Sequence, residues 1–420
     1  MYALVDANNF YVSCERLFAP HLEGRAVGVL SNNDGCVIAR SEEFKALGIP
    51  MGIPTHKIAP ALRRRTTLCS SNYTLYGDLS ARIQQVLAAR VPALEPYSID
   101  ECFLDLRGLP GDLGSLGAGL CEAVAREVGL PVSVGIAPTR TLAKLANHRA
   151  KRQAGRPQVC VWAHGNDRDL HATLAALPLS AVWGIGERLQ CRLLDHGIDT
   201  AGALRSAPIN WLQRRFGVVV ARTALELAGQ PCLAGTDLAT PRRSILCSRS
   251  FRQALRQRAS LAAALRYHCQ RAGEKLRRDD LQAGAIGVFL RTNPFQNVVQ
   301  HRASLWAPLP APSADTLYLN QLAQQLLDEL WEAGLAYHKL GVMLTDLSPR
   351  QHQQASLLAP AESPTQVQLM GAWDSIRARF GRAALTLGIQ APDADWQMHS
   401  RRRSSRYTTR WDELPAVRAR

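Results

Sequence analysis

The first 165 residues alternate short runs rich in β-forming residues with longer runs of helical periodicity. This alternation is typical of a sheet with helices packed on one or both faces. The expected strands cover residues 2–5, 26–30, 94–97, 103–106, 132–136 and 159–162. The expected helices cover residues 10–18, 42–47, 74–90, 116–128 and 140–151. Their β-α-β-β-α-β order predicts a ferredoxin-like domain.

The remaining composition predicts an α+β multidomain protein. Two Gly-Ile-Pro tripeptides mark an insertion in the first domain, and glycine-broken short helices follow Trp162. Strand-like runs then occupy 285–290 and 340–344, ahead of a stretch rich in Gln, Ser, Ala and Pro that predicts a linker. The expected domains are a sheet domain at 1–165 with an insertion at about 35–70, a helical domain at 166–235, an α/β domain at 236–348, the linker at 349–365 and a small C-terminal domain at 366–420.

Neither the composition nor the N-terminus indicates a membrane protein. Apolar residues make up 46% of the chain, but no uninterrupted apolar run approaches the ~20 residues that cross a bilayer. The N-terminal residues lack the pattern of a secretory signal, so we expect a cytoplasmic protein. The ten cysteines include no C-x-x-C pair, so we expect neither a zinc site nor a disulfide framework.

The charge of the chain favours a polyanionic partner. The formal charge is +15 and the pI is near 9.7, and basic side chains gain free energy by releasing counterions from phosphates. Residues 241–303 contain thirteen Arg or Lys and three Asp or Glu, a net +10. This block predicts a surface that faces nucleic acid. The alternative is a merely solvated cationic surface, although such surfaces usually intersperse acids with the arginines.

Asp100 and Glu101 are adjacent carboxylates at an expected turn between two β-rich runs. Consecutive strand residues point to opposite faces, so both acids reach one site only if the chain bends there. Phosphoryl transfer with two metal ions needs several converging carboxylates, and Asp6, at the end of the first expected strand, is the third acid. The alternatives are an exposed turn for the acidic pair and an N-cap role for Asp6.

Three motifs resemble those of the Y-family DNA polymerases, in the same order along the chain. They are Asp6-Ala7-Asn8-Asn9-Phe10-Tyr11, Ser98-Ile99-Asp100-Glu101, and Val134-Gly135-Ile136-Ala137 with Lys144 and Lys151. The resemblance covers the first 345 residues and implies palm, fingers, thumb and little-finger domains. It also implies that two Mg²⁺ ions are held by Asp6, Asp100, Glu101 and the backbone carbonyl of Ala7.

The same resemblance implies a nucleotide site. Tyr11, beside Phe10, matches the steric gate, whose ring leaves no room for a ribose 2′-hydroxyl; the alternative is an ordinary core aromatic. Lys45 and Lys151 match positions that contact the triphosphate, where a cation stabilises developing charge. Where many family members have a Tyr near the triphosphate, this chain has Glu42. Arg40 is the candidate to replace that contact.

Two further regions match DNA-contacting parts of the family. Val182-Trp183-Gly184-Ile185-Gly186, followed by a helix-prone run, resembles a helix-hairpin-helix. Paired glycines let backbone N–H groups approach a phosphate, so Gly184 and Gly186 are candidate primer-template contacts. The basic block matches the little finger, and its candidate DNA-binding residues are Arg242, Arg243, Arg249, Arg252, Arg277 and Arg278.

Residues 31–40 resemble the UmuC branch of the family more closely than the DinB branch, and the extension at 366–420 agrees. Within the linker, Gln354, Leu357 and Leu358 resemble the short peptide by which bacterial polymerases dock on the sliding clamp. By resemblance the partners are primer-template DNA, a dNTP, a processed UmuD-like dimer, the RecA filament and the clamp.

The resemblance therefore implies an error-prone translesion DNA polymerase of the DNA-damage (SOS) response. Two alternatives stay open. One is a catalytically silent DNA-binding accessory that acts as a replication checkpoint, against which the complete set of three acids argues. The other is a palm enzyme with a small-molecule substrate, such as a nucleotidyl cyclase, which has no need of the glycine hairpin or the basic block.

Overall fold

The computed structural model describes residues 1–414 apart from Ala154, Arg156, 164–167, 234–241, 352–361 and 389–395. The chain divides into two compact units. The first unit comprises Met1–Thr240 together with Ser400–Arg420, and the second comprises Pro241–His399. Within the described residues, no helix is long and apolar enough to span a bilayer.

A five-stranded sheet forms the centre of the first unit, in the order β5-β6-β1-β7-β8. Strand β1 lies in the middle and pairs antiparallel with both β6 and β7. The strands are β1 (Tyr2–Ala7), β5 (Ala93–Pro96), β6 (Glu101–Asp105), β7 (Val132–Ala137) and β8 (Gln158–Val161). Every residue of β1 is buried, as expected for a central strand covered on both faces.

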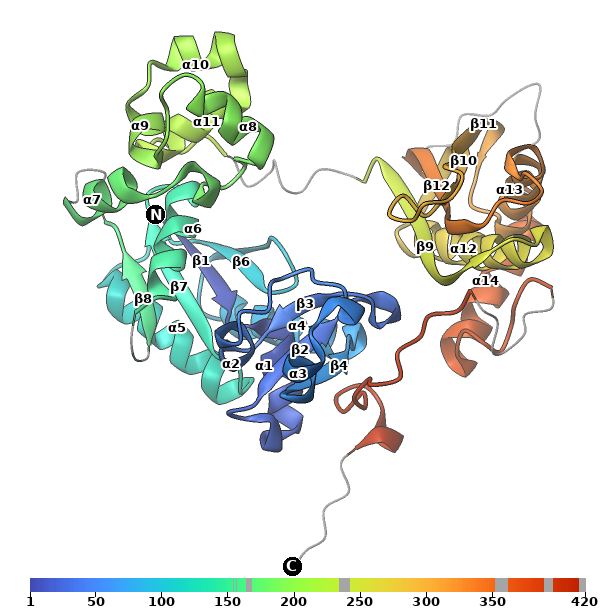
Figure 1. Ribbon diagram of the computed structural model, residues 1–420, viewed down its shortest axis with the longest axis horizontal. Coiled ribbons are helices and arrows are strands. Elements are labelled where there is room, and N and C mark those ends of the chain that lie inside the picture. Colours follow the sequence, from blue (N-terminus) through green and yellow to red (C-terminus); the bar gives the residue numbers. More distant parts are fainter. Residues whose placement is uncertain are drawn as a thin grey trace, which may run out of the picture. The chain divides into compact units, whose positions relative to one another are not determined.

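Helices cover both faces of this sheet (Figure 1). Because side chains alternate along a strand, Ala3 and Val5 of β1 pack with α4 and α5, whereas Tyr2 and Leu4 belong to a cluster that contains α6. The helices are α1 (Phe10–Phe18), α4 (Tyr73–Ala88), α5 (Leu113–Glu127) and α6 (Arg140–Ala150). Strands β1, β5, β6 and β7 with helices α4 and α5 follow the β-α-β-β-α-β order.

The insertion is larger than expected. Residues 26–30 were expected in the central sheet, but β2 pairs antiparallel with β3 and parallel with β4 in a separate three-stranded sheet, so the insertion begins near residue 26 rather than 35. A fully buried apolar run fits either sheet equally, and only strand pairing decides between them. The elements are β2 (Ala26–Leu30), β3 (Val37–Arg40), α2 (Glu42–Ala46), α3 (Pro60–Arg64) and β4 (Thr66–Ser70).

A group of short helices completes the first unit. Its members are α7 (Arg168–Ala176), α8 (Glu187–Leu194), α9 (Ala201–Ser206), α10 (Ile209–Phe216) and α11 (Val218–Leu227). Glu226 of α11 is buried and joins this group to α6: its carboxylate accepts a hydrogen bond from the Thr141 backbone N–H at 3.0 Å, and its carbonyl accepts one from the Thr139 hydroxyl at 2.8 Å. These bonds anchor the helices against the sheet.

The second unit is a four-stranded antiparallel sheet in the order β11-β10-β12-β9, with two helices packed on it (Figure 1). Its elements are β9 (Ser244–Leu255), α12 (Arg258–Arg278), β10 (Leu281–Thr292), β11 (Arg302–Ser313), α13 (Thr316–Leu330) and β12 (Tyr337–Pro349). Helix α14 (Pro364–Phe380) also belongs to this unit and begins with a capping box between Ser363 and Gln366.

The C-terminal extension does not form the single domain expected at 366–420. Its first part, up to His399, belongs to the second unit, whereas Ser400 onward belongs to the first. The only regular element described in the later part is the short 3₁₀ turn Trp411–Glu413. So short a segment rarely supports a core of its own. Trp396 packs in the core of the second unit, and Tyr407 packs against the core of the first.

Candidate active site

Asp100 and Glu101 lie at a turn between β5 and β6 that a serine holds in shape. The Ser98 hydroxyl accepts hydrogen bonds from the backbone N–H groups of Asp100 at 3.2 Å and Glu101 at 3.1 Å, and donates to Asp100 Oδ1 at 2.5 Å. The Tyr97 and Ser98 N–H groups both donate to the Glu101 carbonyl. Serine hydroxyls often accept hydrogen bonds from backbone N–H groups two or three residues later and so stabilise a turn. Ser98 stabilises the turn of the acidic pair in this way.

The turn brings the acidic pair to the end of β1 that holds Asp6. Asp6 lies directly opposite Glu101 in the antiparallel register, and the Ala7 N–H donates to the Asp100 carbonyl at 2.9 Å. Asp6 is only 8% exposed. The structure therefore gathers all three predicted acids, with the backbone of Ala7, at one sheet end. It excludes the N-cap role for Asp6, because Asn9 is the N-cap of α1.

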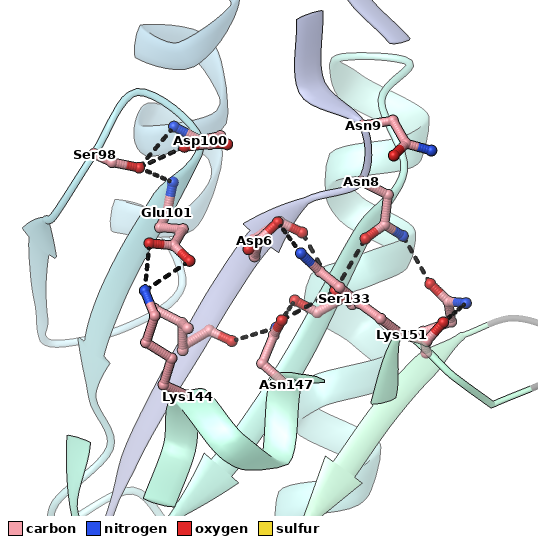
Figure 2. A network of polar contacts seen from close by, with 12 residues as sticks. Asp6, Asn8, Asn9, Ser98, Asp100, Glu101, Ser133, Lys144, Asn147 and Lys151 are labelled. Atoms are coloured by element: carbon pink, nitrogen blue, oxygen red, sulfur yellow. Dashed lines mark hydrogen bonds and ion pairs between the residues drawn. The ribbon is translucent and has the colours of Figure 1, made fainter. Parts of the chain in front are cut away.

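Two lysines of the α6 region reach these acids (Figure 2). Lys151, at the C-cap of α6, places its Nζ 2.5 Å from Asp6 Oδ1. Lys144 Nζ lies 2.9 and 2.8 Å from the two carboxylate oxygens of Glu101. The sequence motif contained both lysines but did not indicate which acid each one pairs with.

The buried position of Asp6 makes its negative charge unfavourable unless a cation lies close to it. Burial raises the pKa of Asp6 to about 7; the Lys151 ammonium opposes this shift and the nearby Glu101 carboxylate adds to it. In the described part of the chain, no three His, Cys, Asp or Glu side chains are grouped closely enough to hold a metal ion. The donor chemistry nevertheless fits a hard divalent cation, since the carboxylates of Asp6 and Glu101 supply the oxygen ligands that Mg²⁺ takes in proteins.

A close approach of α6 to the sheet makes these contacts possible. A Cβ on Gly135 of β7 would lie 2.0 Å from the Asn147 backbone nitrogen and 2.3 Å from the Ala143 carbonyl oxygen, so only glycine fits there. The buried Asn147 side chain donates to the carbonyls of Leu4 at 3.2 Å and Ser133 at 2.7 Å (Figure 2). Sequence reasoning missed Asn147, whose role depends on helix-to-sheet packing.

Tyr11 belongs to an aromatic cluster beside the acids. Its ring stacks on Tyr76 with centroids 4.6 Å apart and planes at 17°, and Tyr73 meets it edge-on at 6.0 Å. Tyr11 is partly exposed, whereas Phe10 is 3% exposed and packs in the core. Burial raises the pKa of Tyr11, and the nearby charges of Tyr73 and Asp100 add to this shift.

Lys45 and Glu42 form one polar group with Asn9. The Lys45 ammonium donates to Glu42 Oε1 at 2.7 Å and to Asn9 Oδ1 at 2.8 Å, and Asn9 Nδ2 donates to Glu42 Oε1 at 3.0 Å. The hydrogen bond from Lys45 holds the pKa of Glu42 below its usual value. Arg40 donates to the Ile49 carbonyl at 2.7 Å, so it also braces the insertion.

The glycine hairpin lies close to the acidic site. Gly184 has φ 86°, a left-handed conformation that favours glycine, and Gly186 is the N-cap of α8. Between them and the acids, the Trp183 indole donates to the Tyr97 hydroxyl at 3.0 Å, and Lys144 Nζ lies 4.7 Å from the Tyr97 ring centroid. One aromatic pair thus connects the hairpin to the lysine that holds Glu101.

The candidate DNA-binding arginines of the second unit differ in their surroundings. Four are exposed, namely Arg242, Arg243, Arg252 and Arg278. Arg242 and Arg278 both pair with Asp279 at 3.0 Å, and Arg249 lies over the Tyr267 ring at 5.4 Å. The prediction for Arg277 is wrong: its side chain is 6% exposed and engages Asp374 of α14 at 2.6 and 2.8 Å.

Arg277 also donates to the Ala314 carbonyl at 2.7 Å and to the Thr316 hydroxyl at 2.8 Å. A guanidinium committed to these partners inside the unit is unavailable to a phosphate. Helical position decides this, since neighbours in sequence such as Arg277 and Arg278 point in different directions. The predicted clamp peptide at Gln354, Leu357 and Leu358 lies outside the described residues.

Comparison with known proteins identifies the family. Residues 5–148 match the impB/mucB/samB family, residues 242–357 its C-terminal domain, and residues 367–417 a domain of unknown function. The chain is 39% identical to the protein UmuC of Salmonella typhimurium over 423 residues, which span 100% of both chains. The chain belongs to the UmuC branch of the Y-family DNA polymerases.

More distant members agree with this assignment. MucB of Escherichia coli is 36% identical over 99% of both chains. DNA polymerase IV of Pelotomaculum thermopropionicum is 28% identical, over 93% of this chain and 95% of its own. A solved Y-family DNA polymerase chimera covers 83% of this chain and 99% of its own with a TM-score of 0.66 and 20% identity, which shows the shared fold. The α+β multidomain architecture is thus that of a Y-family polymerase, with a C-terminal segment added.

Proposed function

We propose that this Y-family chain is a template-directed DNA polymerase that extends a primer 3′-hydroxyl past damaged bases. The observation that carries the proposal is the placement of Asp6 opposite Glu101 on adjacent strands, with Asp100 at the turn beside them. Three carboxylates at one sheet end fit attack of the hydroxyl on a dNTP α-phosphate with release of pyrophosphate.

In this proposal the five-stranded sheet is the palm and the three-stranded insertion is the fingers. The helices from α7 to α11 are the thumb, the β9–β12 unit is the little finger, and the helices and turns beyond 366 are the C-terminal extension. No proofreading domain with a second set of carboxylates is expected from the sequence, so synthesis is error-prone.

Asp6, Asp100, Glu101 and the Ala7 carbonyl would hold two Mg²⁺ ions. When bound, these ions would neutralise the charge that develops on the transferring phosphate. The protein itself supplies Lys151 and Lys45, whose ammonium groups would attract the triphosphate. Lys151 and Lys144 also balance the buried acids before substrate arrives.

The remaining contacts select the sugar and hold the DNA. The ring of Tyr11, beside Phe10, excludes a 2′-hydroxyl, with Arg40 and Lys45 on the side of the insertion. Backbone N–H groups around Gly184 and Gly186 meet a primer-template phosphate without reading the base. The exposed arginines Arg242, Arg243, Arg252 and Arg278, with Arg249, grip duplex phosphates.

The partners in this proposal are a processed UmuD-like dimer, the RecA filament and the sliding clamp, as for an inducible mutagenic polymerase of the SOS response. The clamp would bind Gln354, Leu357 and Leu358 in the linker. Each of these partners is testable by adding it to the purified protein in the assay below.

The decisive experiment is primer extension by the purified full-length chain with dNTPs and Mg²⁺, with EDTA in a parallel reaction. We expect extension that EDTA abolishes and that Asp6→Asn reduces to background. Glu122→Gln, which changes an exposed acid of α5 outside the site, is the matched control and should extend normally. DNA binding without extension by the parent protein, with and without the partners, would instead favour a catalytically silent accessory.

A further inference from the structure

Residues 400–414, here called the tail segment, lie on the first unit where β4 ends and α4 begins. Arg402 exchanges hydrogen bonds with Ser70: the Ser70 N–H donates to the Arg402 carbonyl, and the Arg402 N–H donates to the Ser70 hydroxyl, both at 3.0 Å. Tyr407 stacks on Phe18 with centroids 4.7 Å apart and planes at 17°. The tail segment is therefore docked at two places on the unit that holds the acids.

The central contact of the tail segment is with Asn72, the N-cap of α4. The Asn72 amide donates to the carbonyls of Ser404 at 3.0 Å and Ser405 at 3.1 Å, and to the Ser404 hydroxyl at 3.0 Å. Its own oxygen accepts from the Leu75 N–H at 3.4 Å and so begins the helix. One side chain thus ties the tail segment to the first turn of α4, which carries Tyr73 and leads to Tyr76.

Glu15 of α1 forms a second connection. Its side chain is buried, at 4% exposed, and one carboxylate oxygen accepts from the Tyr76 hydroxyl at 2.6 Å and the Ser404 hydroxyl at 3.0 Å. Burial raises the pKa of Glu15, and these two hydrogen bonds oppose the shift. An unsatisfied polar group costs free energy in the protein interior. We therefore expect the Glu15 side chain to change its position when it loses one of its two donors.

Both connections end at the same ring. Tyr76, held by Glu15, stacks on Tyr11, and Tyr73, in the first turn begun by Asn72, meets Tyr11 edge-on. Tyr11 is the residue that the proposed function assigns to sugar selection.

We propose that the tail segment positions Tyr11: Ser404, through Glu15 and Asn72, orients the Tyr76 and Tyr73 rings against which Tyr11 rests. This inference rests on the proposed function, since it requires Tyr11 in the nucleotide site. It assigns a role to part of the C-terminal domain of unknown function. Ser404, Glu15 and Asn72 are positioning residues, because none of them touches the reacting atoms.

The test compares substitutions in the full-length chain by steady-state insertion of one dNTP and of the matching rNTP. Ser404→Ala should lower the preference for dNTP over rNTP by about fivefold, mainly through the KM values of the two nucleotides. This is the order of effect expected when a hydrogen bond to a carboxylate is lost and influences Tyr11 only through other residues. Ser404→Thr keeps the hydroxyl and should restore selection. Ser405→Ala is the matched control, since Asn72 uses only the Ser405 backbone carbonyl.

A double substitution separates positioning from general destabilisation. If Ser404 acts through Tyr11, adding Ser404→Ala to Tyr11→Ala should change sugar selection no further, because the ring to be positioned is gone. Tyr76→Phe removes the other donor to Glu15 and should reproduce the Ser404→Ala effect. It provides a second route to the answer if Ser404→Ala folds poorly, which thermal unfolding would reveal.

The outcomes are distinguishable. The positioning role would be overturned if Ser404→Ala and Tyr76→Phe preferred dNTP over rNTP as strongly as Ser405→Ala does, while Tyr11→Ala admitted rNTPs. The proposed function would still stand. Additive effects in the double substitution would overturn it as well, because Ser404 would then act elsewhere. Absence of primer extension by the parent protein, or unchanged selection in Tyr11→Ala, would overturn the inference together with the function or gate on which it rests.

Discussion

The acidic site of the first unit and the basic surface of the second place their charges in opposite ways. Asp6 is buried, and Asp6 and Glu101 each contact a lysine at 2.5–2.9 Å. In the second unit, four of the six candidate arginines are exposed. Chemistry on one phosphate requires a few charges at defined positions, whereas holding a long polyanion requires many charges at loosely defined ones.

Arg277 shows what happens when a charge of the second unit is buried. It is bound by Asp374, a backbone carbonyl and a hydroxyl, and so links α12 to α14 rather than facing solvent. Burial therefore decides whether an arginine of this block stabilises the fold or is available to bind DNA, even when two arginines are neighbours in sequence. The predictions below test this division between the two units.

The largest effect should come from the acidic site. Glu101→Gln should lower the single-turnover incorporation rate by at least about 10³-fold, because the amide cannot supply the negative charge that the site chemistry needs. DNA affinity, measured by fluorescence anisotropy, should change less than about threefold, since the arginines proposed to bind DNA lie in the other unit. Near-parent incorporation by this variant would remove Glu101 from the catalytic set.

The next effect concerns substrate choice. Tyr11→Ala should lower the preference for dNTP over rNTP on the order of a hundredfold, because the ring proposed to exclude the 2′-hydroxyl is lost. Tyr11→Phe, which keeps the ring, is the control and should select like the parent. Selection is measured as the ratio of kcat/KM values. If Tyr11→Ala excludes rNTPs normally, the gate lies elsewhere and Phe10 is the next candidate.

Two neighbouring arginines should differ in their effect on stability. Arg277→Ala should lower the free energy of unfolding of the second unit by about 3 kcal/mol, because Asp374, the Ala314 carbonyl and the Thr316 hydroxyl all lose their bonds to a buried guanidinium. Arg278→Ala, which removes an exposed pair with Asp279, should cost about 0.5 kcal/mol. Thermal and urea unfolding of the full chain measure both; equal losses would contradict the architectural role of Arg277.

The exposed arginines should act through salt-dependent grip. Arg242→Ala combined with Arg243→Ala should lower the slope of log affinity against log salt concentration by about two, one for each phosphate contact. Sequence preference should stay unchanged. The control is Arg107→Ala, an exposed arginine of the first unit paired with Asp105. A slope equal to that of the control would show that DNA does not contact this part of the second unit.

The smallest effect on basal synthesis belongs to the linker. Replacing Gln354, Leu357 and Leu358 together by Ala should leave single-nucleotide insertion within about twofold, since changes distant from a site are usually mild. Stimulation by the clamp should fall sharply, because tethering raises the effective concentration at the primer to the order of millimolar. If the clamp stimulates the variant and the parent equally, these three residues are not the docking peptide, and the C-terminal extension is the next region to test.

Local patterns predicted most of the elements of the first unit. The helix expected at 140–151 is α6, at Arg140–Ala150, and the strand expected at 132–136 is β7, at Val132–Ala137. These elements follow from apolar periodicity and local propensity. The strand at 26–30 was also located correctly, but its sheet was not, because pairing partners are chosen between segments far apart in sequence.

The site was predictable to the extent that it consists of motifs. Asp6, Asp100 and Glu101 were identified, and the register of β1 with β6 brings them together. The lysine pairings, the Asn147 bonds to the sheet and the Glu15 contact with Ser404 could not be anticipated, since each depends on how a helix or the tail segment packs. Ser98 carried a local signal that a turn analysis would have found.

The sequence by itself determined the order of the elements, the acids at the turn, the excess of basic residues and, through its motifs, the family. These properties depend on neighbours along the chain and on composition. Only the tertiary structure decided that Arg277 is buried while Arg278 is exposed, that β2 joins the insertion, and that the tail segment returns to Glu15 and Asn72. The physical reason is that burial and hydrogen-bond satisfaction are properties of the packed interior, and segments hundreds of residues apart contribute to them together.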